Sequence, residues 1–203
     1  MSRRPLPSPP LLIISDRSQA RRPLPEIAAA AFRGGCRWFS LREKDLPAAG
    51  RHALLAELIA LGRNYGALVG IHDDLDTTAD AVHLPGNGDP ASVRRRLPHA
   101  LIGVSAHTPA EAAAQLGAGA DYATLSPIFL TDSKPGYGPA LGLDGLTQAA
   151  KLTDGPFVAL AGITPANAAS CLAAGAAGIA VMGEVMRADD PESVVRAFIR
   201  AIA

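Results

Sequence analysis

Short apolar runs recur along the chain, separated by alanine-rich segments that carry scattered polar residues. The first, LLIISD (11–16), is hydrophobic without alternation until Ser15 and Asp16. An unbroken apolar run of this length predicts a strand that is buried on both faces, as in a parallel sheet. Seven further runs have the same form: RWFSL (37–41), GALVGIH (66–72), AVHL (81–84), LIGVSA (101–106), YATLSPI (122–128), FVALAG (157–162) and GIAVMG (178–183).

The segments between these runs have helical periodicity, as in AAGRHALLAELIALGRNYG (48–66) and PAEAAAQLGAGA (109–120). Eight strands alternating with helices in 203 residues predict a single (β/α)8 TIM barrel, at the small end of that class. The main alternative, an open doubly wound sheet, would place a GxGxxG turn after the first strand. The chain has no such turn and no break in composition that would divide it into halves.

The first ten residues differ from the rest, with four prolines and two arginines. We expect a flexible N-terminal arm over residues 1–10 and one TIM-barrel catalytic domain over 11–203. Cys36 and Cys171 lack the spacing of a metal site and are expected to be reduced packing residues.

Charge and hydropathy exclude several classes of partner. Lys plus Arg and Asp plus Glu both number 19, so the chain as a whole has no electrostatic attraction for nucleic acid or an anionic membrane. No apolar run approaches the roughly 18 residues that a membrane-spanning helix needs. We therefore expect a cytoplasmic protein that binds small molecules. The sequence does not fix its oligomeric state, and a homodimer is one possibility.

The second predicted strand ends in four consecutive charges, Arg42 to Asp45. Side chains alternate along an extended chain, so Arg42 and Lys44 can point the same way while Glu43 and Asp45 point the other way. A guanidinium and an ammonium together suit a phosphate or diphosphate, and barrel enzymes carry their chemistry at these strand ends. Solvated salt bridges are the competing interpretation of the same charges.

Three other strand ends and one loop carry candidate ligands. Asp73 follows a buried strand and is the candidate Mg2+ ligand, since Mg2+ uses one or two carboxylates beside substrate phosphates. LAGIT (160–164) and VMGEV (181–185) follow the last two strands, where barrels often bind phosphate through backbone N–H groups. The loop SPIFLTDSKPGYGPALG (126–142) is long enough to close over a ligand.

In order and spacing these pieces resemble the thiamine-phosphate synthases and their relatives, the TenI-type thiazole tautomerases. The resemblance extends over nearly the whole chain from Leu11 to Ala203. It is carried by ISD (14–16), LREKD (41–45), VHLP (82–85), IGVSAHT (102–108), GADY (119–122), SPIFLTDSKPG (126–136), LAGITPANA (160–168) and GIAVM (178–182).

The resemblance to the synthases implies that thiazole phosphate attacks an aminopyrimidine diphosphate and that diphosphate leaves with Mg2+. On that basis Arg42, Lys44 and Lys134 would hold the diphosphate, and Ser105 would contact the reacting centre or the leaving group. Asp73 would bind the metal. The substrate-binding residues would be Ser40, His72, Ser133, Gly162, Met182 and Gly183, the last three around the thiazole phosphate.

The chain also departs from the synthase pattern. Ser40 stands where the synthases usually have Gln, and His72 stands where they usually have Asn. Their second metal carboxylate aligns with Gly88, so Asp89 could bind the metal only if its loop shifts by one residue. Two alternatives therefore remain. One is a tautomerase, which needs neither metal nor diphosphate. The other is a non-catalytic regulator that binds thiazole or thiamine phosphate. Retention of Arg42, Lys44, Asp73 and the Ser133–Lys134 pair favours the synthase.

Overall fold

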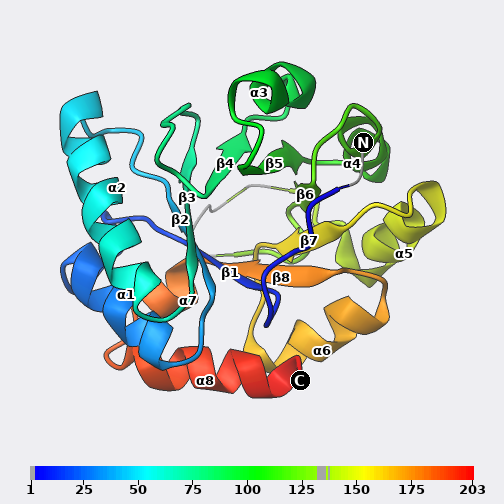
Figure 1. Ribbon diagram of the computed structural model, residues 1–203. Coiled ribbons are helices and arrows are strands. Elements are labelled where there is room, and N and C mark those ends of the chain that lie inside the picture. Colours follow the sequence, from blue (N-terminus) through cyan, green and yellow to red (C-terminus); the bar gives the residue numbers. More distant parts are fainter. Residues whose placement is uncertain (1–2, 132–135, 137) are drawn as a thin grey trace.

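Eight parallel strands close into a barrel in a computed structural model that describes residues 3–131, 136 and 138–203 (Figure 1). Each strand pairs with its neighbours in sequence, and β1 also pairs with β8, which confirms the predicted TIM barrel. The strands are β1 (Leu11–Ile14), β2 (Trp38–Leu41), β3 (Leu68–His72), β4 (Ala81–Leu84), β5 (Leu101–Ala106), β6 (Tyr122–Leu125), β7 (Phe157–Leu160) and β8 (Gly178–Val181).

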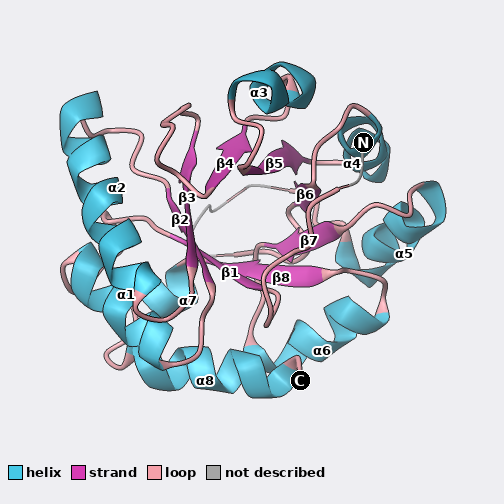
Figure 2. Cartoon of the chain, viewed as in Figure 1, coloured by secondary structure: helices cyan, strands magenta, loops and turns pink. Residues whose placement is uncertain are grey.

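The helices lie outside the strands and cover them (Figure 2). No helix within the described ranges is both long and apolar enough to cross a membrane. Their bounds are α1 (Leu24–Arg33), α2 (Ala48–Arg63), α3 (Pro90–Arg96), α4 (Pro109–Gly117), α5 (Gly142–Leu152), α6 (Pro165–Ala173), α7 (Gly183–Met186) and α8 (Pro191–Ala201).

The strict alternation of strand and helix fails between β3 and β4, which are joined by residues 73–80 without a helix. This connection is rich in Asp and Thr, whose side chains bond to nearby backbone and favour turns over helices. Asp76 accepts hydrogen bonds from the backbone N–H of Thr78 at 2.7 Å and from its hydroxyl at 2.5 Å. A short turn therefore replaces the expected helix.

Two apolar layers hold the barrel together. The larger lies between the strands and the surrounding helices and includes Phe32, Phe39 and Leu55. The smaller fills the inside of the barrel and includes Leu12, Trp38 and Tyr122. Because side chains alternate along a strand, each strand supplies both layers, which explains why the predicted runs are apolar throughout.

The N-terminal arm, predicted to be flexible, packs against the end of the barrel where the strands begin (Figure 1). Leu6 packs beneath the inner apolar layer, and the Pro10 carbonyl accepts a hydrogen bond from the Ile179 N–H at 3.0 Å. The Arg4 N–H donates to Asp121 Oδ1 at 2.9 Å. Asp121 is 1% exposed and also binds Arg94, so this contact anchors the arm to a buried ion pair.

Tyr122, the first residue of β6, points into the barrel opposite Gly103 of β5. Its ring lies edge-on to Trp38, with ring centroids 4.8 Å apart. A Cβ atom at position 103 would lie 2.1 Å from Tyr122 Cζ, well inside van der Waals contact. Only glycine at this position leaves room for the tyrosine ring.

Replacing Gly103 by Ala is therefore expected to lower the free energy of unfolding by about 1–3 kcal/mol, since the overpacked ring must move. Urea unfolding followed by fluorescence of Trp38, the one tryptophan in the chain, measures this change. Gly117→Ala in α4 is the matched control, because a Cβ atom there meets nothing within 4 Å. The control should be neutral or stabilising by up to about 1 kcal/mol, and an equal loss in both variants would contradict the packing argument.

Candidate active site

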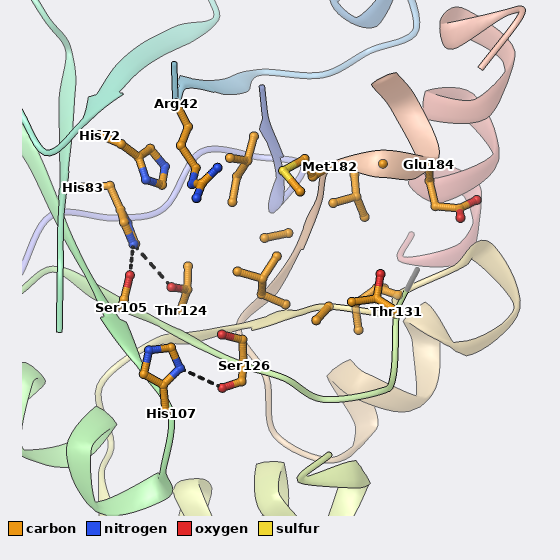
Figure 3. A pocket seen from close by; sticks show the side chains of 18 of the residues that line it. Arg42, His72, His83, Ser105, His107, Thr124, Ser126, Thr131, Met182 and Glu184 are labelled. Carbon is orange, nitrogen blue, oxygen red and sulfur yellow. Dashed lines mark hydrogen bonds between the residues drawn. The ribbon is translucent and has the colours of Figure 1, made fainter. Parts of the chain in front are cut away.

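The carboxyl ends of the strands surround a cavity of about 800 Å³. Figure 3 shows Arg42, His72 and His83 on one side of it, with Met182 between Arg42 and Glu184. Eight of the residues predicted from the sequence line this cavity: Arg42, Lys44, His72, Asp73, Ser105, Gly162, Met182 and Gly183.

Two predicted residues do not line the cavity. Ser40 is 2% exposed and lies one inward-facing position before Arg42, which places its short side chain deeper in the barrel. Asp89 Oδ1 accepts a hydrogen bond from the Ser92 N–H at 2.9 Å and so caps α3. The loop shift needed to bring Asp89 to the metal position is therefore not seen. Ser133 and Lys134 lie outside the described residues.

The predicted division of the charges after β2 is seen in the structure. Arg42 and Lys44 line the cavity, whereas Glu43 is 2% exposed and turns away from it. Glu43 Oε1 accepts a hydrogen bond from Ser15 Oγ at 2.6 Å, and its carboxylate also accepts from the Arg17 N–H. Burial raises the pKa of the Glu43 carboxyl, while these hydrogen bonds favour its charged form.

Ser15 links this buried carboxylate to the cavity wall. Its hydroxyl donates to Glu43 and accepts a hydrogen bond from the Arg42 N–H at 2.8 Å. Asp45 pairs with Arg17 outside the cavity. Through Ser15 and Arg17, Glu43 thus holds the β1 and β2 loops together, and the backbone of Arg42 is fixed where its guanidinium can reach a ligand.

Asp73 lies directly after β3 and pairs with Lys44. Its backbone has φ 52°, a left-handed conformation that Asp tolerates better than most residues. Its N–H donates to the His83 carbonyl at 2.9 Å. The next carboxylate, Asp74, turns towards α2, where Arg51 Nη2 lies at 2.7 Å and His52 Nε2 at 2.9 Å from its Oδ2. Asp73 alone of the two therefore faces the cavity.

This donor set fits Mg2+ only as an ion shared with a bound substrate. Among the residues that the structure describes, no group of three or more His, Cys, Asp or Glu side chains is arranged to hold a metal. Asp73 offers one carboxylate in the cavity wall. Mg2+ commonly takes one or two protein carboxylates together with substrate phosphates and water, so a phosphorylated ligand would have to supply the remaining oxygens.

Two buried histidines form part of the cavity wall. The rings of His72 and His83 lie against each other at a tilt of 32°, with centroids 4.4 Å apart. Burial lowers the pKa of His83 to about 4, with Asp73 opposing and Lys44 adding to the shift. Burial, followed by the charges of His83 and Arg42, brings the pKa of His72 well below its usual value. Both rings are neutral at pH 7, so the positive charges in the described cavity lining are those of Arg42, Lys44 and Arg187.

Four residues that were not predicted from the sequence as site residues also line the cavity: His83, His107, Thr124 and Ser126. His83 is 2% exposed, and what remains of its surface faces the cavity. His107 Nδ1 lies 3.0 Å from the Ser126 carbonyl, and the next residue, Thr108, caps α4. The alternation of inward and outward residues near each strand end was the available signal for these positions.

The far end of the cavity is formed by the loops after β7 and β8. Gly162 has φ 65°, and a Cβ atom there would lie 2.6 Å from the Leu130 carbonyl oxygen. The neighbouring Ala161 is also left-handed, with φ 79°. Asn167 Nδ2 donates to the Gly162 carbonyl at 2.9 Å and fixes this turn at the start of α6. At Gly162 and Gly183 the backbone lines the cavity without a side chain in between, which suits phosphate contacts through N–H groups.

Comparison with known proteins agrees with this geometry. A thiamine-phosphate synthase from Roseiflexus sp. (strain RS-1) is 39% identical over 198 residues, which cover 94% of this chain and 84% of the relative. The synthase from Roseiflexus castenholzii is 41% identical over 192 residues, covering 91% and 84%. The solved structure of thiamine phosphate pyrophosphorylase from Pyrococcus furiosus superposes with a TM-score of 0.84 at 30% identity, covering 95% of this chain and 94% of that one.

The sequence profile of one family, described as thiamine monophosphate synthase, matches residues 11–185. That span runs from the first residue of β1 to α7 and includes every cavity-lining residue considered above. The chain therefore belongs to the thiamine monophosphate synthase family.

Proposed function

We propose that this enzyme joins an aminopyrimidine diphosphate to thiazole phosphate, giving thiamine phosphate and diphosphate. The observation that carries the proposal is a single cavity with two places suited to anions. Arg42 and Lys44 line it at one place, and Gly162 and Gly183 line it at another. A reaction between two phosphorylated substrates needs both places within one site.

The bond that breaks joins the methylene carbon of the pyrimidine to a diphosphate oxygen, and its electron pair leaves with the diphosphate. The amino-substituted ring shares the positive charge left on the methylene, and the thiazole nitrogen supplies the electron pair of the new C–N bond. The chain has to hold two substrates in line and to neutralise the departing charge. Arg42 and Lys44 are the cations for that charge, and Ser105 is a hydroxyl donor in the same wall.

Mg2+, when bound, would neutralise part of the charge that builds up on the leaving diphosphate. Asp73 would hold it, with the diphosphate and water as its other ligands. Lys44, which pairs with Asp73, would then be released to the diphosphate. We also propose that Ser133 and Lys134 contribute to the diphosphate site, as their loop position suggests.

A thiazole tautomerase is the second candidate, because Asp89 caps a helix and leaves the cavity with one acidic residue at the expected metal position. That reaction would need neither Mg2+ nor a diphosphate. It would leave the grouping of Arg42, Lys44 and Asp73 without a purpose, which is why the synthase is preferred.

The purified protein, mixed with the aminopyrimidine diphosphate, thiazole phosphate and Mg2+, is expected to form thiamine phosphate and diphosphate over many turnovers, measured by chromatography. Formation of neither product, with accelerated aromatisation of the carboxythiazole phosphate tautomer, would identify a tautomerase instead. Binding of thiamine phosphate without turnover of any of these compounds would identify a regulator.

Asp73→Asn is expected to raise the Mg2+ concentration for half-maximal rate by at least about tenfold, since the amide is a weaker metal ligand. Calorimetry should show thiazole phosphate binding unchanged within about twofold, because its site lies at the other end of the cavity. Without Mg2+, the variant should bind diphosphate at least as tightly as the parent, because Lys44 no longer has a carboxylate partner.

Asp45→Asn is the control for this experiment, since Asp45 is an exposed carboxylate that pairs with Arg17 outside the cavity. Its Mg2+ dependence should match that of the parent protein. Equal loss of metal dependence and thiazole phosphate binding in Asp73→Asn would contradict the metal assignment.

A further inference from the structure

A chain of hydrogen bonds runs through the barrel interior to the cavity. Figure 3 shows its cavity end, where His83 meets Ser105 and Thr124. Tyr122 Oη lies 3.0 Å from His83 Nδ1, and His83 Nε2 lies 3.1 Å from Ser105 Oγ. Thr124 Oγ1 is a second, longer neighbour of the same nitrogen at 3.3 Å. Tyr122 and His83 are 1% and 2% exposed, whereas Ser105 is partly exposed and lines the cavity.

The direction of these hydrogen bonds follows from counting the donors and acceptors of Tyr122, His83 and Ser105. A neutral imidazole has one N–H donor and one acceptor nitrogen. If His83 Nδ1 carried the proton, the buried Tyr122 hydroxyl would have to accept there, and no other acceptor for its own proton is found among the described residues. A buried donor left without a partner costs about 1–3 kcal/mol. The satisfied arrangement has Tyr122 donating to Nδ1 and the Nε2–H of His83 donating to Ser105.

Two further properties agree with this direction. Burial raises the pKa of Tyr122, so its hydroxyl keeps the proton that it donates. His83 is buried and its two ring nitrogens face only hydroxyl groups, an environment that suits a neutral imidazole with one acceptor nitrogen. Once Ser105 Oγ accepts from His83, its own proton is available to the cavity.

We propose that Tyr122 and His83 are positioning residues that turn the Ser105 hydroxyl proton into the cavity, where it donates to the departing diphosphate. The identity of that anion rests on the proposed function, but the direction of the hydrogen bonds does not. No proton is transferred along the chain. Ser105 contributes a fixed dipole that is already aligned when negative charge develops on the leaving group, and the deeper residues keep it aligned.

The packing of the barrel interior supports a fixed arrangement. The Tyr122 ring occupies the space left by Gly103 and lies against Trp38, so its hydroxyl is held at the His83 side. The His83 ring lies against the ring of His72 at a tilt of 32°. Rotation of either ring would break contacts on both sides, which limits the alternatives open to the Ser105 hydroxyl.

The direction can be read from the ring nitrogens of His83 by ¹⁵N NMR at pH 7.5, without any substrate. The chain has 5 histidines, and the His83 signals are identified as those lost in His83→Asn. The parent protein should show the Nε2–H tautomer. Tyr122→Phe removes the donor to Nδ1 with almost no change in volume, and should reduce the ratio of Nε2–H to Nδ1–H by about tenfold.

Function is tested with the same variant. Tyr122→Phe should lower kcat for thiamine phosphate formation by about tenfold and leave the KM for thiazole phosphate within about twofold, as expected for an interaction made at the leaving group. It should also weaken the binding of inorganic diphosphate with Mg2+ by several-fold. Tyr65→Phe, the same change beside Phe32 on the outer face, is the matched control and should alter none of these values.

An Nδ1–H tautomer in the parent protein, or an unchanged tautomer ratio in Tyr122→Phe, would overturn the proposed direction. A shifted ratio with unchanged kcat and unchanged diphosphate affinity would overturn its role at the leaving group. If the parent makes no thiamine phosphate, the proposed function fails separately, and diphosphate binding alone then decides the inference: weaker binding by Tyr122→Phe supports it, and equal binding refutes it.

Discussion

The constraint on which this structure depends is the alternation of side chains in a closed parallel barrel. Every second residue of each strand points inward, and all strands end at the same face, so eight inward positions converge there. Within one strand the interior changes from apolar to polar in a single step, from Ala81 to His83 in β4 and from Tyr122 to Thr124 in β6. A slip of one residue in any strand would move its polar residue out of the cavity and into the layer against the helices.

Several buried polar groups of the interior have a hydrogen-bond partner before a ligand arrives, although Trp38 Nε1 and His72 Nε2 have none among the described residues. The Glu43 carboxylate is surrounded by donors from the β1 loop, and the imidazole of His83 lies between a tyrosine and two hydroxyls. Both histidines of the wall are neutral. The positive charges that face the cavity are therefore those of long side chains, Arg42 and Lys44 among them, which can reach a ligand without leaving a buried charge unpaired.

The sequence was sufficient for the barrel because its signals are local and repeated: apolar runs, alanine-rich helices and polar strand ends. It was also sufficient to place Arg42, Lys44 and Asp73 in one wall, since their order along strand ends fixes their position. Contacts between residues far apart in the sequence could not be predicted in this way. The composition of residues 1–10 predicts a flexible arm, and it gives no sign of the hydrogen bond from the Arg4 N–H to Asp121 across the barrel end.

Other differences arise from competition between two roles for one residue. An aspartate before a helix can serve either as a metal ligand or as a helix cap. Asp89 serves as the cap, because its side chain accepts a hydrogen bond from the nearby Ser92 N–H. Ser40 has the inward direction expected of a binding residue but too short a side chain at too deep a level. The alternation of side chains along a strand predicts whether a side chain points into the barrel. It does not predict how deep in the barrel the side chain lies, because that depends on how the strands are staggered.

The ion pair between Lys44 and Asp73 has a thermodynamic consequence. Each charge is the counterion of the other, so a cation that takes Asp73 releases Lys44, and an anion that takes Lys44 releases Asp73. Under the proposed function the affinities for Mg2+ and for diphosphate are therefore linked, and each ligand must raise the affinity for the other by the same factor. The wall then responds weakly to either ion alone and strongly to the two together, which selects a metal-bound diphosphate over the many simple phosphates in solution.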